Sequence, residues 1–227
     1  PLYCHQDTIH YPSGTITTGN GNQYYLSNSH CTWLINPECG SSVQLQFNRF
    51  NLAQGDTLFV YDGYDEQSNL LQFYTSQNIP ILTDQPSPTT LKSTSNSIFL
   101  KFISDSISQD LGFNISYASK YCNIDTLTAS SGIISDGSGD CDYNNNTNCR
   151  WIISPPNAQA LSLNFTQFEL PPNTTNDFIL IYKNSISTSN KIALLDATNP
   201  PTEPIYIPAG KAIIKFVTNS SVTAPGW

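Results

Sequence analysis

The chain has 227 residues, a formal net charge of −8 and only 11% charged residues. This length suffices for two domains that each bury a core, and 11% aromatic residues supply large buried area. The negative charge excludes bulk attraction to nucleic acid or an anionic membrane, and no apolar run approaches the roughly 20 residues of a membrane helix. We therefore expect protein partners or self-assembly, no nucleic acid, and no membrane insertion in this segment.

The polar composition favours a protein that works outside the cell. Charged residues make up about 25% of typical soluble domains, so here Ser, Thr, Asn and Gln must supply solubility in their place. The chain begins at Pro1 without a basic-then-apolar leader, which predicts a mature, processed product. We expect an extracellular protein, secreted or held at the cell surface.

Two stretches of the chain repeat each other at a near-constant spacing, which means that they solve the same packing problem. Seven residues recur 118 positions later: Cys4, Cys31, Trp33, Leu45, Phe47, Phe50 and Leu52 return as Cys122, Cys149, Trp151, Leu163, Phe165, Phe168 and Leu170. Asp56 and Tyr61 return as Asp177 and Tyr182, and Gly112 returns as Gly226. The repeat predicts two tandem domains, residues 1–119 and 120–227.

The elements expected within each copy are strands. Residues 42–47 and 161–165 alternate between apolar and polar side chains, a period of two that is typical of half-buried strands. Residues 58–61 and 178–182 are apolar at every position, so we expect strands covered on both faces. Because no long stretch has helical spacing and turn residues recur often, the fold class is all-β, with two tandem antiparallel β-sandwiches.

These motifs resemble the CUB domain family of extracellular, jelly-roll-like β-sandwiches. The resemblance rests, in the first copy, on residues 31–35 (CTWLI), 47–52 (FNRFNL), 60–63 (VYDG), 102–105 (FISD) and 112–117 (GFNISY), which occur in the family's order. The second copy keeps the early motifs. The resemblance implies protein or glycan recognition and assembly outside the cell, although a fold alone does not fix a function.

The second copy ends early. Gly112 and Phe113 open a final strand in the first copy, whereas the second copy reaches only Gly226 and Trp227, where the same strand should begin. A sandwich that lacks a strand exposes unpaired backbone groups and part of its core. Three explanations stay open: the chain was cut short, the tail is disordered, or a neighbouring chain donates a strand.

The six cysteines predict disulfide bonds. The family resemblance implies the pairs Cys4–Cys31 and Cys122–Cys149, which both span 27 positions. Cys39 and Cys141 lack counterparts in each other's copy, so by elimination they pair with one another, within or between chains, or each pairs with a neighbouring molecule. Two free thiols are the alternative, and an oxidising compartment disfavours it.

Five Asn-x-Ser/Thr sequons predict N-linked glycans. They lie at Asn114, Asn145, Asn164, Asn173 and Asn219. Asn114 and Asn164 each lie between two inward-facing apolar residues, so their side chains should point to solvent, where a glycan can be attached. We expect most of the five to be modified.

Many members of the resembled family bind Ca²⁺ through a Glu and two Asp residues. Here Ala53 and Pro171 stand at the Glu position of the two copies. The first copy keeps Asp56 and Asp105, which are the Ca²⁺ candidates, and the second keeps only Asp177. Because Ca²⁺ takes 6–8 oxygen ligands, we expect an impaired site in the first copy, none in the second, and no other cofactor or metal.

No hydrolase elbow, zinc-protease helix or phosphate-binding glycine loop occurs, so we expect no catalysis. The early end of the second copy, the two extra cysteines and the low charge together favour a structural or adhesive assembly subunit of a filament, coat or matrix. Two alternatives remain: a ligand-recognition module of a secreted or cell-surface receptor, and a non-catalytic part of an extracellular enzyme.

Overall fold

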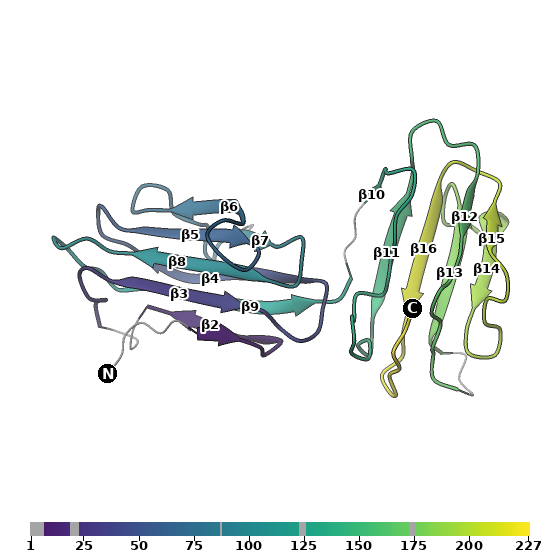
Figure 1. Cartoon of the computed structure of the whole chain (residues 1–227), viewed down its shortest axis with the longest axis horizontal. Helices are drawn as coiled ribbons and strands as arrows, with labels where there is room; N and C mark the ends of the chain where they lie inside the picture. Colours follow the sequence, from purple (N-terminus) through teal and green to yellow (C-terminus); the bar gives the residue numbers. More distant parts are fainter. Residues whose placement is uncertain (1–6, 19–22, 87, 123–125, 173–175) are drawn as a thin grey trace. The chain divides into compact units, whose positions relative to one another are not determined.

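The computed structural model describes residues 7–18, 23–86, 88–122, 126–172 and 176–227. The chain divides into two compact units, Pro1–Lys120 and Tyr121–Trp227. Apart from a short 3-10 turn at Thr188–Asn190, the regular elements in these ranges are strands, which confirms the all-β class (Figure 1). No helix in the described ranges has the length and apolarity to cross a membrane.

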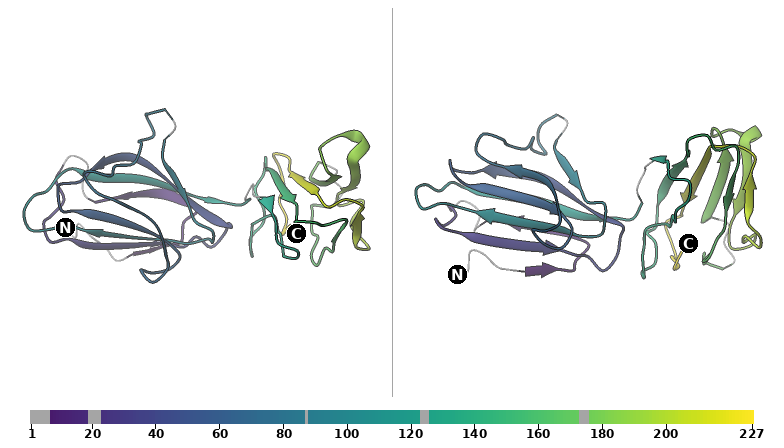
Figure 2. Two further views of the ribbon diagram at one scale, coloured as in Figure 1. Left: turned by 90° about the horizontal axis from the view of Figure 1, so that it is seen from above. Right: turned by 45° about the horizontal axis from the view of Figure 1, so that its top comes forward.

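The first unit is a sandwich of two sheets, whose layers Figure 2 shows from two further sides. One sheet has the order β1 (Asp7–Ile9), β3 (His30–Ile35), β8 (Ile98–Ile103), β5 (Thr57–Asp62) and β6 (Asn69–Tyr74). The other has the order β2 (Ser13–Thr17), β9 (Gly112–Lys120), β4 (Ser42–Asn51) and β7 (Thr90–Lys92).

Alternate side chains of β4 face the core of the first unit. Val43, Leu45 and Phe47 point inward and are fully buried. Their strand pairs antiparallel with β9, so that Ile115 lies opposite Phe47 and Tyr117 lies opposite Leu45. The inward residues of the two sheets thus form one apolar layer, as the period-two pattern predicted.

Two details differ from the sequence-based expectation. The sheets are not wholly antiparallel, because β1 runs parallel to β3 at the edge of the first unit. The outer face of β5 is also not covered: Phe59 and Tyr61 remain partly exposed, and their rings stack on each other at 6.3 Å. Apolar side chains on that face shield one another and do not meet a further layer.

The second unit keeps the first of the two sheets. Its order is β10 (Thr126–Leu127), β11 (Asn148–Ile153), β16 (Ala212–Val217), β13 (Phe178–Lys183) and β14 (Lys191–Leu195), again with a parallel edge pair. Trp151 and Phe216 take the core positions of Trp33 and Phe102. The repeated residues therefore pack alike in both units.

The other sheet of the second unit has only two strands, β12 (Leu161–Leu163) and β15 (Ile205–Ile207). Residues 131–135, which correspond to β2, are described but form no strand, and the strand expected over 161–165 ends at Leu163. The counterpart of β9 is a single bridge between Gly226 and Glu169. On the side where β9 lies in the first unit, residues 131–135 and 164–167 form no strand.

Candidate functional site

A buried tyrosine and a buried aspartate face each other at one end of the first unit. The Tyr25 hydroxyl donates a hydrogen bond to Oδ2 of Asp56 and accepts one from the backbone N–H of Ala53 at 2.8 Å. The other carboxylate oxygen of Asp56 accepts the backbone N–H of Asp105 at 2.8 Å. Asp56 is completely buried, and these donors satisfy both of its oxygens.

The second unit repeats this arrangement. The Tyr143 hydroxyl donates to Oδ2 of Asp177 at 2.6 Å, and the backbone N–H of Asn219 donates to Oδ1 at 2.8 Å. Burial, together with the hydrogen bond to the neighbouring aspartate, raises the pKa of both Tyr25 and Tyr143 well above the usual value. The tyrosines are therefore neutral donors that hold a buried carboxylate in place.

The residues around this pair do not fit a Ca²⁺ ion. In the first unit both oxygens of Asp56 are engaged by donors, and Ala53 offers no carboxylate where the family has Glu. In the second unit Pro171 and Asn219 replace two of the three acids. No group of three or more Asp, Glu, His or Cys residues that could hold a metal occurs in the described part of the chain. The donor set falls short of the 6–8 oxygens that Ca²⁺ takes.

Tyr143 gives a direct test of this structural role. Tyr143→Phe removes the donor to Asp177 Oδ2, and a buried polar group without its partner costs about 1–3 kcal/mol. We expect the second unit to lose about 2 kcal/mol of its free energy of unfolding. Amide hydrogen exchange of β13 and β16 measures the loss, with the exposed Tyr206→Phe as the matched control. Equal exchange rates in the two variants would contradict the assignment.

Sequence analysis missed both tyrosines as site residues. Tyr25 lies 31 positions from Asp56, and single-sequence patterns do not bring such distant residues together. A signal was nevertheless present, because Tyr25 and Tyr143 obey the same spacing of 118 as the repeated cysteines. A repeated polar residue in a core pattern therefore indicates a buried hydrogen bond.

The structure contains a disulfide bond between Cys122 and Cys149, whose Cα atoms are 5.8 Å apart. Cys31 is buried, while its predicted partner Cys4 lies outside the described residues. No described cysteine is free, which excludes the alternative of two free thiols at Cys39 and Cys141. The pairing of Cys39 with Cys141 stays a prediction.

The predicted glycosylation sites differ in exposure. Asn145 and Asn164 are exposed, whereas Asn114 and Asn219 are half-buried. The amide oxygen of Asn114 accepts a hydrogen bond from Asn48 at 2.7 Å, and that of Asn219 accepts the backbone N–H of Ser221 at 2.6 Å. Asn173 lies outside the described residues. Attachment of glycans at all five stays a prediction.

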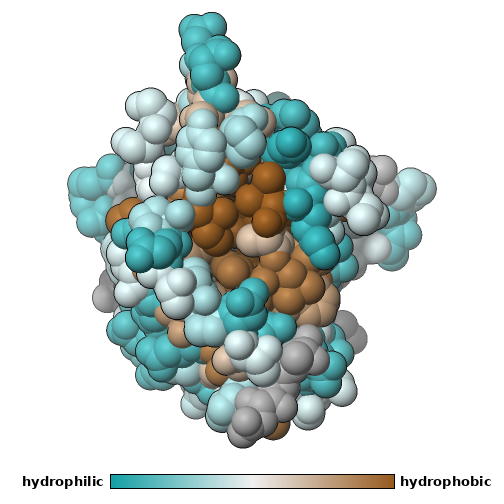
Figure 3. All heavy atoms as spheres, turned by 90° about the vertical axis from the view of Figure 1, so that its right-hand side faces the viewer, coloured by the Kyte–Doolittle hydropathy of each residue, from teal (hydrophilic) through white to brown (hydrophobic). Residues whose placement is uncertain are grey.

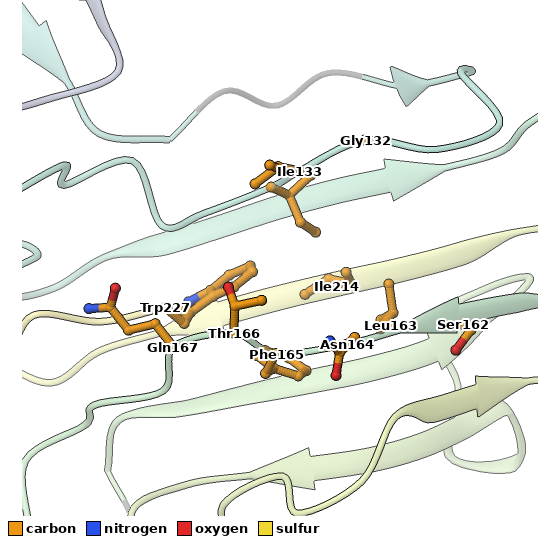
Figure 4. Close-up of a pocket in the computed structure, with 11 residues that line it drawn as sticks. Gly132, Ile133, Ser162, Leu163, Asn164, Phe165, Thr166, Gln167, Ile214 and Trp227 are labelled. Carbon is orange, nitrogen blue, oxygen red and sulfur yellow. The ribbon is translucent and has the colours of Figure 1, made fainter.

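The second unit has an open groove in its incomplete sheet. One side is formed by Gly132, Ile133 and Ile134, and the other by residues 162–167, with Ile214 and Trp227 between them (Figure 4). Ile133 is 97% exposed at the rim. Figure 3 shows hydrophobic side chains gathered in a hollow on the face of the second unit that it draws.

Comparison with the first unit shows what the groove exposes. Val43, Leu45 and Phe47 are fully buried there. Their counterparts Leu161, Leu163 and Phe165 are only partly buried. In the first unit β9 lies beside all three positions in the same sheet. The groove, which Leu163 and Phe165 line, is therefore an apolar surface that has a neighbouring strand in the first unit.

Both units match the family model described as "CUB domain", over residues 4–117 and 122–227. The chain belongs to the CUB domain family. The strand pattern, the Cys122–Cys149 bond and the repeated core of the two units are thus those of two tandem CUB domains. Because these matches take up nearly all of the chain, its function has to be sought in CUB domains.

The chain is similar to segments of much longer proteins. The chain is 29% identical to tolloid-like protein 1 of Mus musculus over 98% of this chain and 22% of that protein. It is 31% identical to cubilin of Homo sapiens over 95% of this chain and 6% of that protein. A solved MASP-1 CUB2 domain bound to Ca²⁺ is 23% identical, with a TM-score of 0.39, and covers 51% of this chain and 100% of that one. The chain thus spans less than a quarter of the curated relatives it matches.

Proposed function

We propose that this CUB pair is a non-catalytic, protein-binding module of an extracellular multidomain protein, and that the second domain binds through the exposed apolar surface around Ile133. The observation that carries this proposal is the match of both units to the CUB domain model, over residues 4–117 and 122–227. Ile133 is 97% exposed, so it is available for contact with a partner.

The chemistry of the buried acids supports a binding role. Asp56 and Asp177 are the fully buried carboxylates at the repeated site, and each is held by a tyrosine hydroxyl and a backbone N–H. A general acid or base needs a proton that substrate can reach. Carboxylates that are enclosed and fully hydrogen-bonded in this way stabilise the loops. We therefore expect recognition to use surface residues.

An extracellular location is supported by the Cys122–Cys149 bond, because disulfides persist in oxidising compartments. The low content of charged residues and the exposed sequons at Asn145 and Asn164 agree with a glycosylated surface. Similarity to segments of longer proteins favours a recognition module over a subunit of a filament, coat or matrix, the function that the sequence alone favours.

Self-assembly is the second candidate function, because the same exposed apolar surface around Ile133 could contact a second copy of the chain. A photo-crosslinking amino acid placed at Ile133 in the full-length protein on its own cells separates the two functions. Ile107, which is 83% exposed in the first domain, is the matched control position. Crosslinked peptides are identified by mass spectrometry.

We expect Ile133, and not Ile107, to crosslink to a different polypeptide. A crosslink from Ile133 to a second copy would replace the recognition function by self-assembly. A crosslink to another part of the same chain would show that the groove is filled internally, and it would overturn the proposal. Equal yields at Ile133 and Ile107 would also overturn it, because the groove would then be no better a binding surface than any exposed position.

A further inference from the structure

The five-stranded sheet of the second domain carries positive charge on the face that points away from the core. Along β11 and β16 every second side chain enters the core, and Arg150 and Lys215 are among those that point outward. Among the described residues, the strands of this domain contain the basic residues Arg150, Lys183, Lys191 and Lys215 and no acidic residue. The charge of these strands is therefore opposite to that of the whole chain, which is −8.

Two of these cations face each other. Arg150 lies directly opposite Lys215 on the neighbouring antiparallel strand. At such positions the Cβ atoms are about 5 Å apart, and like charges there destabilise a sheet. No acid in the described part of the chain forms an ion pair with either side chain. A local feature that lowers stability without a compensating contact is typical of a functional site.

The first domain has the same lysine without this repulsion. Lys101 corresponds to Lys215 in the repeat and lies opposite Thr32 in the same register. Lys101 forms an ion pair with Glu66, so its charge is neutralised within the domain. The fold itself therefore requires neither the arginine nor an uncompensated lysine at this face.

The second domain also lacks the acid. Glu66 follows Tyr61 by five positions, and Ser187 follows the corresponding Tyr182 by the same number. The strands on both sides of this turn pair alike in the two domains, with the same irregularity just before each tyrosine. The second domain thus has a serine in place of the acid and an arginine in place of a threonine, and both differences make the same face more positive.

The remainder of this face is apolar. A row of outward side chains crosses four neighbouring strands, β14, β13, β16 and β11 (Figure 1), in the order Leu194, Leu180, Lys215 and Arg150. Leu194 is 38% exposed. A partner that fits presents carboxylates beside apolar side chains, as a protein does, whereas a sulfated polysaccharide has few apolar groups to cover the leucines.

We propose that this outer face, formed by Leu194, Leu180, Lys215 and Arg150, binds an acidic segment of a protein partner. Its carboxylates contact the two cations and remove their repulsion, since the arginine offers a fork of donors that matches a carboxylate. This inference adds a second surface to the proposed function, because Ile133 lines a groove on the core side of the same sheet. The two surfaces are therefore tested separately.

Two synthetic peptides test the proposal, ELDELLDE and its uncharged counterpart QLNQLLNQ. Titrated into the 227-residue chain, ELDELLDE should bind saturably with a dissociation constant on the order of 100 µM, because exposed charge pairs are weak. It should shift the NMR signals of Lys215 and Leu194, and binding should weaken as salt is added. Equal binding of QLNQLLNQ, no saturable binding of ELDELLDE, or shifts confined to other strands would overturn the proposal.

Substitutions copied from the first domain locate the contact. Arg150→Thr should weaken ELDELLDE binding about tenfold, and Arg150→Lys, which keeps the charge, should weaken it less. Ser187→Glu gives Lys215 an acid partner and should weaken binding to a similar extent. The matched controls are Lys92→Thr, which removes a cation from the first domain, and Ser162→Glu, which adds an acid to the other sheet of the second. Losses in the controls as large as those in the variants would assign binding to net charge alone.

Stability separates a binding role from a structural one. Because Arg150→Thr removes the repulsion from Lys215, amide hydrogen exchange of β11 and β16 should stay equal or slow down while peptide binding falls. Faster exchange in Arg150→Thr would show that the arginine stabilises the sheet, and the loss of binding would then not support a contact.

Two further measurements test the partner class and the location. A heparin oligosaccharide that bound more tightly than ELDELLDE, with the same dependence on Arg150, would replace the protein segment by a sulfated polysaccharide and overturn the proposal. Ile133→Ser should leave peptide binding unchanged; a loss there would place the peptide in the groove. Failure of ELDELLDE to bind alongside an Ile133 crosslink to another protein would reject the acidic partner of the outer face and keep the proposed function.

Discussion

Replacing Trp227 with alanine should lower the free energy of unfolding of the second domain by about 3–5 kcal/mol, the usual cost of deleting a large buried aromatic side chain. The indole packs edge-on against Trp151, with ring centroids 5.0 Å apart, and against Phe216 at 6.1 Å. It also lies 5.8 Å from Phe165 on the groove side. Trp227 thus joins the sheet of β11 and β16 to the incomplete sheet.

The first domain also has a buried aromatic side chain at the position of Trp227. Phe113 has the same position in the first domain, where it packs against Trp33 at 5.8 Å and Phe102 at 5.6 Å. The rest of β9 also borders the core there. Trp227→Phe keeps an aromatic ring and the backbone bonds to Asp136, so it should cost less than half as much as alanine.

Native-state hydrogen exchange with mass spectrometry measures this effect domain by domain, which avoids treating a two-domain chain as a single transition. Tyr206→Ala is the matched control, because Tyr206 is an aromatic residue of the same domain that is 65% exposed; it should change stability by no more than about 0.5 kcal/mol. Exchange in β8 of the first domain should stay unchanged. A loss for Trp227→Ala no larger than that for Tyr206→Ala would contradict the core role.

The regular part of the fold could be predicted because it depends on local pattern. Val43, Leu45 and Phe47 alternate with polar residues, and the structure buries all three on one face of β4. The same pattern at residues 161–165 gave a strand that is too long, since β12 ends at Leu163. Alternation sets which side chains face inward, but pairing with a neighbouring strand decides how far a strand extends.

The candidate site was only partly predictable. The family resemblance predicts Asp56 and Asp105 as Ca²⁺ candidates, and in the structure the backbone N–H of Asp105 donates to Asp56. What the pattern could not supply is the tyrosine hydroxyl that occupies the other oxygen. Contacts between residues far apart in sequence depend on the closed sandwich, and only the repeat spacing hinted at them.

The groove, too, could be predicted only in part from the sequence. The sequence shows that Gly132 repeats Gly14, but it does not show what each glycine faces. In the structure Gly132 faces open space, whereas Gly14 meets Tyr117. Collapse depends on how well the surrounding side chains relax into a vacant volume, which a linear pattern does not encode.

Removing the Cys122–Cys149 bond should destabilise the second domain by about 3.5 kcal/mol, the chain-entropy estimate for a closed loop of this length. The loop spans 27 positions and joins the start of the domain to β11, so its loss lets the N-terminal segment separate from the sheet. The double variant Cys122→Ala, Cys149→Ala avoids leaving a single reactive thiol. In a domain of this size the midpoint of thermal unfolding should fall by more than about 10 °C.

The double variant Cys39→Ala, Cys141→Ala is the matched control, since these cysteines are predicted to pair with each other and so close no loop within the second domain. Hydrogen exchange in β11 and β16 should rise strongly in the first double variant and much less in the control. If both double variants raised exchange there equally, the loop between Cys122 and Cys149 would have no special part in holding this domain together. Gly132 and Ile133 follow Cys122 by about ten residues and form one wall of the groove, so this bond lies close to that wall in the sequence.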